Sequence, residues 1–407
     1  MWWYVDSVMI GRQRAEAAQY DIPRGNLSDL YPRWLGAREL LLHHRDPYSR
    51  DVTREIQAGY YGRPLDPARP HDPVDQQGFA YPVYVVFLLA PTIPFPFAVV
   101  QAGFRWFLVA LTIASILLWL RTLRWRAPAV TIAIVGVLVF GSFPVIQGLK
   151  LQQLSLLVSG LIAACAVLID EEHLAAAGVL LAMATIKPQL ALPMAAWLLL
   201  WALSGWRQRR GLALGFGVSM AALFAASEYV LPGWIARFSA AVAAYRQYTG
   251  GAGSVLDELL TPRAGEFLSA LVLLAVAIVG WQNRRAPAES PAFNWTTVFV
   301  LAATVVIAPK TAPYNQVLLL PALMLAAQHW RRLWTRGPLA RAGTLVSASL
   351  VVWPWLAVVA LAGASFFLPE KAVQKAWTLP LYTTLAIPGA VIMLLALIRK
   401  DPTEDAL

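Results

Sequence analysis

The chain has 407 residues and a formal net charge of +10, but only 14% of its residues are charged and 58% are hydrophobic. A soluble domain typically has roughly a quarter of its residues charged, so this composition excludes an ordinary soluble protein and predicts one that crosses a membrane several times. Its basic residues gather in short loops between apolar runs, which is typical of cytoplasmic loops and argues against a nucleic-acid partner. Cys165 is the single cysteine, which leaves no disulfide framework and no thiol metal site.

The chain begins with MWWYVDSVMIGRQR, an apolar start that is too short to span a membrane and is followed by no signal-peptide cleavage site. A protein of this kind usually opens with a full span, so we expect the start to be late or the first span to be degenerate. Residues 29–49, DLYPRWLGARELLLHHRDPYS, then mix charged and apolar positions. They predict a helix on the membrane surface with Asp29 as its N-cap. We assign residues 1–77 to one extracytoplasmic loop with interfacial helices.

Residues 79–96 carry four prolines and predict a broken or re-entrant hairpin, because proline interrupts helical hydrogen bonding. A span needs roughly 20 apolar residues. The rest of the chain predicts an all-α membrane protein with about 10–12 transmembrane helices, a multi-span domain over residues 78–400 and a cytoplasmic tail over 401–407. The expected spans are 98–120, 128–147, 151–169, 174–186, 188–204, 211–231, 265–282, 294–308, 315–330, 341–363 and 377–398.

Charge predicts which loops face which side. If residues 121–126 are cytoplasmic, then 207–210, 284–285, 331–341 and 399–400 fall on the same side. Residues 1–77, 147–153, 232–265 and the turn after Ile307 fall on the opposite face. The first part of 232–265 predicts an amphipathic helix at the interface. Gly211 and Gly215 predict close helix packing.

Polar residues converge on the extracytoplasmic face. Lys187 and Lys310 each lie beside a proline between two short spans, and ionisable groups at membrane depth commonly line a site. Snorkelling lysines are the alternative. A carboxylate at this boundary can take a proton from a sugar hydroxyl while cations neutralise a leaving phosphate, so Asp29 is the candidate general base. The candidate donor-binding residues are Lys187, Gln189, Lys310, Gln147, Gln152 and Gln153, and the candidate acceptor-binding or cavity-lining residues are Tyr31, Arg33, Tyr81, Tyr314, Asn315 and Glu228.

Two other groups of titratable residues are weaker candidates. His43 and His44 would point about 100° apart on a helix and have no carboxylate cluster beside them, so we expect no metal site. The DEEH turn at residues 170–173 falls on the cytoplasmic side, where a solvated turn is expected. The chain has no GxxxxGK[ST], HExxH or nucleophile elbow, so it gives no support to ATP-driven, zinc-protease or serine-hydrolase chemistry.

Five motifs in order resemble glycosyltransferase family 87 of the GT-C superfamily. They are DLYPRWLGARELLLHHRDPY, FAYP, QGLKLQQLSLLVSGLIAA, AAAGVLLAMATIKPQLALP and APKTAPYNQVLLLPAL. The resemblance covers residues 29–323. It implies an inverting hexosyltransferase, with mannose as the usual sugar and a polyprenyl-phosphate sugar as donor. The chain departs from the common family pattern in HHRDPY, LKLQQ and KTAPYN, which leaves the sugar open.

The resemblance also implies roles and partners. Asp29 would be the acceptor-activating base, and the glutamine-rich turn and Lys187 would belong to the donor side of the cavity, with Lys187 binding the donor phosphate. The partners would be the lipid bilayer, the lipid-linked sugar and a cell-envelope glycan or glycolipid acceptor, with no further cofactor. The enzyme would reside in the plasma membrane, the inner membrane of a bacterium. A secondary transporter or flippase is the alternative, because broken helices with charged residues also mark transport sites.

Overall fold

The computed structural model describes residues 1–20, 22, 24–248, 253–309 and 312–399, and within these ranges the chain is helical with no strand. This confirms the predicted all-α class. The predicted tail at 401–407 lies outside the described residues. Before the first long helix the elements are the π-helix η1 (Tyr4–Ile10), α1 (Gly11–Gln19), α2 (Tyr31–His43), α3 (Arg50–Tyr61), α4 (Val85–Leu89) and the 3-10 helix η2 (Ala90–Thr92).

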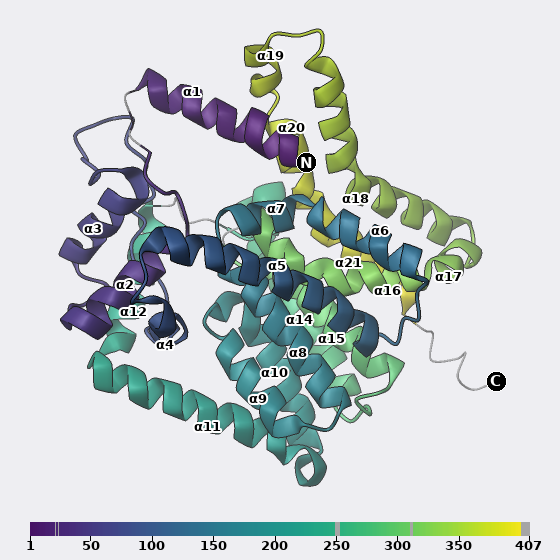
Figure 1. Cartoon of the computed structure of the whole chain (residues 1–407). Coiled ribbons are helices and arrows are strands. Elements are labelled where there is room, and N and C mark those ends of the chain that lie inside the picture. Colours follow the sequence, from purple (N-terminus) through teal and green to yellow (C-terminus); the bar gives the residue numbers. More distant parts are fainter. Residues whose placement is uncertain (21, 23, 249–252, 310–311, 400–407) are drawn as a thin grey trace.

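The rest of the chain forms the bundle in Figure 1. Its elements are α5 (Phe97–Thr122), α6 (Ala129–Phe140), α7 (Phe143–Lys150), α8 (Leu154–Asp170), α9 (Leu174–Ala184), α10 (Pro188–Ser204), α11 (Trp206–Val230), α12 (Trp234–Tyr248), α13 (Val255–Leu259), α14 (Pro262–Asn283), α15 (Pro291–Ile307), the 3-10 helix η3 (Pro313–Leu319), α16 (Leu320–Gln328), α17 (Trp330–Thr335), α18 (Pro338–Ala364), α19 (Glu370–Lys375), α20 (Thr378–Thr383), the 3-10 helix η4 (Thr384–Ala386) and α21 (Ile387–Ile398).

Several of these helices are long and apolar enough to cross a membrane. Among the described residues there are five such stretches: α5, α11, α14, α18 and the run Glu370–Ile398. The pair α6 and α7 would make a sixth, bent by 57° at its break. Helices α8, α9, α10 and α15 are apolar but shorter. The protein is therefore a multi-pass membrane protein. The eleven predicted spans all coincide with helical segments. Among the described residues, however, only five of them, or six with the bent pair α6 and α7, are long and apolar enough to cross a membrane.

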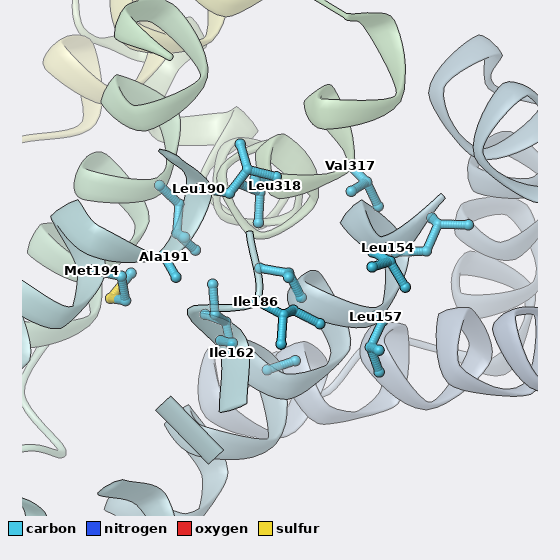
Figure 2. Packing of buried hydrophobic residues seen from close by; sticks show 14 of the residues in the cluster. Leu154, Leu157, Ile162, Ile186, Leu190, Ala191, Met194, Val317 and Leu318 are labelled. Carbon is cyan, nitrogen blue, oxygen red and sulfur yellow. The ribbon is translucent and has the colours of Figure 1, made fainter. Parts of the chain in front are cut away.

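The short helix α8 packs against α10 and against the 3-10 helix η3. Figure 2 shows buried side chains of the hydrophobic cluster that these elements share, namely Leu154, Leu157 and Ile162 from α8, Ile186 from the turn before α10, Leu190, Ala191 and Met194 from α10, and Val317 and Leu318 from η3. Close packing of this kind leaves little room for a segment to shift. The ends of these three elements are therefore fixed relative to one another.

Small residues hold α9 against α11. A Cβ atom on Gly178 would collide with the backbone of Leu212, and one on Gly215 would collide with the backbone of Ala175. Gly211 also faces α9 across a short gap to Leu174. The predicted close packing at Gly211 and Gly215 is thus confirmed.

The part of the first loop that holds α2 and α3 lies at one end of the bundle with α4 and α12 (Figure 1), whereas η1 and α1 contact α19. An ion pair joins Arg237 on α12 to Asp46 after α2, and the Tyr48 hydroxyl donates to the Tyr81 carbonyl at 2.5 Å. Residues 79–96 contain only the five-residue α4 and a 3-10 turn, so they are broken as predicted. The predicted helix early in 232–265 is also present, as α12.

Asp29 does not cap α2, contrary to the sequence prediction. The helix begins at Tyr31, its N-cap position is Leu30, and no side chain donates or accepts a capping hydrogen bond there. Pro32 in the first turn has no N–H to be capped. The Asp29 carboxylate is consequently available for contacts elsewhere.

The predicted topology can be tested by cysteine labelling. Ala68 and Arg207 are both exposed, and their loops are predicted to face opposite sides. In a Cys165→Ala background, we expect a membrane-impermeant maleimide added to intact cells to label Ala68→Cys but to label Arg207→Cys only after permeabilisation. Equal labelling of both positions in intact cells would contradict the assignment.

Candidate functional site

Three polar side chains come from the starts of the three elements in the packed centre. Gln153 is the residue before α8, Lys187 is the residue before α10, and Asn315 lies in the first turn of η3. Proline sets two of these starts, because Pro188 and Pro313 cannot continue a preceding helix but fit a first helical turn. The breaks predicted around Lys187 thus place polar groups at the buried ends of apolar helices.

Lys187 is buried, with 4% of its surface exposed. Its ammonium Nζ lies 2.6 Å from Ser155 Oγ, 3.2 Å from Gln153 Oε1 and 3.4 Å from Asn315 Oδ1. It also lies 4.7 Å from the ring centre of Tyr314. An ammonium has three hydrogens to donate, so three acceptors of the protein match its capacity. This geometry rules out the alternative of a lysine that snorkels to the surface.

Asp29 is joined to Lys187 through one side chain. The Gln153 amide donates to Asp29 Oδ2 and accepts from Lys187 on its other side. The Tyr60 hydroxyl donates to Asp29 Oδ1 at 3.1 Å, and the Asp29 backbone N–H donates to the Leu151 carbonyl at 3.0 Å. The carboxylate of the first loop is therefore held by the bundle and by α3 at the same time.

A second glutamine, Gln152, joins the first loop to the bundle. Gln152 is fully buried with a positive φ of 49°, and its Oε1 accepts from Ser28 Oγ at 2.6 Å and from Gln101 Nε2 at 3.2 Å. Its own amide donates to the Leu149 carbonyl at 2.7 Å. Gln152 thus fixes the residue before Asp29 to the turn before α8.

Arg33 lies one turn into α2 and faces Tyr81. Its Nη2 donates to the Tyr81 hydroxyl at 2.6 Å, and its guanidinium carbon lies 4.0 Å from the Tyr81 ring centre. Stacking on an aromatic face is a favourable arrangement for arginine. The positive charge of Arg33 lies close enough to Asp29 to lower the pKa of that carboxyl.

These residues open onto a cavity of about 670 Å³. Its polar lining residues include Asp29, Arg33, Asp75, Gln77, Tyr81, Lys187, Gln189, Tyr245, Arg246, Tyr314 and Asn315. Its apolar lining residues include Ile186, Leu192, Phe238, Val242 and Ala243. The members from α12 recur along one face of that helix, so α12 forms a wall of the cavity.

Seven of the residues proposed from sequence line this cavity: Asp29, Arg33, Tyr81, Lys187, Gln189, Tyr314 and Asn315. Gln152 and Gln153 lie behind the lining and hold Asp29 and its neighbour. Lys310 lies outside the described residues.

The remaining three proposed residues also lie outside the lining of the cavity. Tyr31 packs against α3 at Gly59, where a Cβ atom would collide with the tyrosine ring. Gln147 lies in α7. Glu228 accepts from the Gly233 backbone at 2.8 Å and so closes the turn after α11. We therefore assign these three to the surrounding structure.

The structure adds four residues that sequence reasoning missed. Ser155 accepts from Lys187, Tyr60 donates to Asp29, and Asp75 and Arg246 line the cavity. Ser155 is one hydroxyl in the apolar run LQQLSLLVSG and has no motif around it. Arg246 could have been found from its place late in the predicted amphipathic helix of residues 232–265. Tyr60 could have been found as the next position after Val52 and Ile56 on the buried face of α3, whereas Asp75 lies outside any helix and no periodicity indicates its place.

Burial raises the pKa of Asp29 above its usual value, against the opposing effects of Arg33, of the Tyr60 hydrogen bond and of Lys187. The neighbouring Asp75 also raises it. A raised pKa makes the Asp29 carboxylate a stronger base than an exposed one. Arg33 and Lys187 lower the pKa and so favour the ionised form of the group. Among the described residues no group of three histidine, cysteine or acidic side chains could hold a metal ion.

The fold and the site define a class of protein: a multi-pass helical membrane protein with a carboxylate and a buried lysine beside a cavity of mixed polar and apolar lining. The model of glycosyltransferase family 87 matches residues 79–309, more than half of the chain. The chain belongs to this family and is a membrane glycosyltransferase. No curated protein and no solved structure matches it. The match begins after Asp29 and Arg33 and includes Lys187.

The raised pKa of Asp29 has a consequence for stability. A carboxyl group with a raised pKa in the folded state stabilises the fold fully at a pH below its unfolded pKa, and this contribution is lost as pH rises through the folded pKa. We therefore expect Asp29→Asn to melt at a higher temperature than the parent at neutral pH, with the gap closing toward pH 4. Thermal unfolding in detergent measures this, with exposed Asp51→Asn as control. A variant that melts lower at neutral pH would contradict it.

Proposed function

We propose that this glycosyltransferase moves a hexose, with mannose as the leading candidate, from a polyprenyl-phosphate-linked donor to a cell-envelope glycan or glycolipid. The observation that carries the proposal is the link Asp29–Gln153–Lys187 beside a cavity that is lined by both polar and apolar side chains. A lipid-linked sugar phosphate likewise combines a polar head with an apolar chain. No cofactor is needed, because the sugar-phosphate bond itself supplies the leaving group.

The cavity suits the polar head of such a donor. Arg33 and Lys187 provide positive charge at its polar end. The N-termini of α8 and α10 point to the same place, and helix N-termini favour anions. In a site shielded from water these charges stabilise negative charge far better than they would in solution.

The apolar side suits the lipid chain. Leu192 on α10 and Phe238 and Val242 on α12 line it. Leu192 is 55% exposed, and on a helix of a membrane protein such a residue faces lipid. A polyprenyl chain lying along these side chains would leave the sugar beside Asp29.

The transfer follows from this placement. Asp29 takes the proton of the acceptor hydroxyl as its oxygen attacks C1 of the sugar. The bond between C1 and the phosphate oxygen breaks, and its electron pair stays on the phosphate. Attack opposite the leaving phosphate inverts the configuration at C1. The polar side chains of Asp75, Gln77 and Arg246 provide hydrogen-bonding groups for the hydroxyls of the acceptor.

The predicted topology puts this reaction on the extracytoplasmic face of the plasma membrane. The first loop, which carries Asp29 and Arg33, and the turn with Lys187 belong to the same predicted side. The family match supports glycosyl transfer over the transporter alternative, for which no internal repeat is evident in the sequence.

Asp29→Asn tests the base directly. General-base assistance is typically worth about 10²–10⁴-fold in rate, so we expect kcat to fall by that order while donor affinity changes little. The measurement is transfer from a panel of radiolabelled polyprenyl-phosphate sugars by membranes that contain the variant. Turnover near that of the parent would remove Asp29 from the mechanism.

Tyr60→Phe tests the protonation state of the same carboxylate. The Tyr60 hydrogen bond lowers the Asp29 pKa, so its loss should move the acid limb of kcat/KM to higher pH. Tyr229→Phe, at a residue that is 89% exposed, serves as the control and should leave the limb in place. A limb that stays unchanged or moves to lower pH in Tyr60→Phe would show that another group titrates.

A further inference from the structure

The two cations beside Asp29 are already engaged by the protein. Arg33 Nε and Nη1 have almost no accessible surface, and Nη2 donates to the Tyr81 hydroxyl at 2.6 Å. The Lys187 ammonium meets acceptors at 2.6, 3.2 and 3.4 Å, which match its three hydrogens. An anion in the cavity could therefore bind to either cation only after these groups had rearranged.

Each of these cations lies against the ring of one tyrosine. The Arg33 guanidinium carbon is 4.0 Å from the ring centre of Tyr81, and Lys187 Nζ is 4.7 Å from the ring centre of Tyr314. Both tyrosines line the cavity together with Asp29. A cation at this distance makes the electrostatic potential around the ring more positive. The charges of Arg33 and Lys187 thus favour an anion beside the two tyrosines.

The hydroxyls of both tyrosines have hydrogen-bonding capacity left. A phenol hydroxyl has one hydrogen to donate and can also accept. Tyr81 accepts from Arg33, and no acceptor for its own hydrogen occurs among the described residues. The Tyr314 hydroxyl has no partner in the described part of the chain and is not one of the buried unpartnered atoms there, so its oxygen is accessible. Two hydroxyl hydrogens therefore remain for a ligand.

Two hydroxyl donors backed by cations fit an anion with several oxygens. Burial, the largest effect, raises the pKa of both phenols, so the hydroxyls keep their protons and donate at neutral pH. A hydroxyl that accepts from a cation is also polarised toward stronger donation. The Asp29 carboxylate does not take these hydrogens, because it accepts from Gln153 and Tyr60. Among the groups of a lipid-linked sugar, the phosphate matches these donors best.

We propose that the hydroxyls of Tyr81 and Tyr314 bind the donor phosphate, and that Arg33 and Lys187 are positioning residues behind them. This inference rests on the proposed function, and it moves the phosphate contact from Lys187, which the sequence suggested, to the two tyrosines. When the bond between the sugar C1 and the phosphate oxygen breaks, the electron pair stays on that oxygen. The two phenols hold the phosphate by hydrogen bonds and keep their protons, while Asp29 takes the proton of the acceptor.

The binding experiment uses farnesyl monophosphate and farnesol as probes with the purified full-length protein in detergent. We expect the parent to prefer the phosphate by about 100-fold, because each of two hydrogen bonds to a charged group is worth about 10-fold or more in affinity. Tyr81→Phe and Tyr314→Phe should each bind the phosphate about 10-fold more weakly and bind farnesol as before. Tyr229→Phe, at a residue that is 89% exposed, should bind both probes as the parent does.

Double substitutions test whether the cations act through the tyrosines. Arg33→Gln alone should weaken binding of the phosphate probe, but it should have little further effect in a Tyr81→Phe protein, because the group it acts through is already gone. Lys187→Gln should behave in the same way toward Tyr314→Phe. Losses that add up in either double variant would show that the cation contacts the phosphate itself, and would overturn its assignment as a positioning residue.

The outcomes distinguish the two levels of the proposal. A parent protein that binds farnesol as tightly as its phosphate would overturn the lipid-phosphate donor itself. A parent that prefers the phosphate, with the preference unchanged in both Tyr81→Phe and Tyr314→Phe, would overturn only the assignment to the tyrosines. Melting temperature and gel filtration show whether each variant is folded. The two phenylalanine variants lack only one oxygen atom each, so they decide the phosphate contact even if Arg33→Gln or Lys187→Gln does not fold.

Discussion

The site depends on one buried charge, the ammonium of Lys187. An ammonium inside a membrane protein is unfavourable unless its hydrogens meet acceptors, and here the acceptors come from the starts of α8 and η3. The apolar side chains of the same elements, shown in Figure 2, belong to one buried cluster and hold these starts in place. Lys187 therefore links the packing of the bundle to the orientation of Gln153, and through Gln153 to Asp29.

Sequence patterns predicted the helices well because apolar run length and proline breaks act locally. Helical structure is interrupted around Lys187 and over residues 79–96, where the prolines lie. The cap at Asp29 was predicted wrongly because a capping aspartate and one drawn to a distant amide look alike in sequence. What could not be predicted was the partner of each polar group, since Ser155 and Tyr60 reach the site only through the tertiary packing of α8 and α3.

The cavity combines two surfaces that arise from different parts of the chain. The first loop, the helix starts and Arg246 supply charged lining residues, and Leu192 of α10 and Phe238 and Val242 of α12 supply apolar ones. An ion pair between Arg237 and Asp46 joins α12 to the first loop. A reaction between a lipid-bound donor and a polar acceptor needs such a boundary, where each substrate stays in its own medium.

The link from Gln152 to Ser28 has a consequence for biosynthesis. It joins residues that are 124 positions apart, and Asn315 is a further 160 positions beyond its partner Ser155. The first loop therefore has its own partner once Gln152 is made, whereas Lys187 meets its acceptor Asn315 only after the ribosome has delivered more than three quarters of the chain. A nascent chain stopped after α10 would hold Lys187 without its acceptor Asn315, so fragments that end there cannot complete the site.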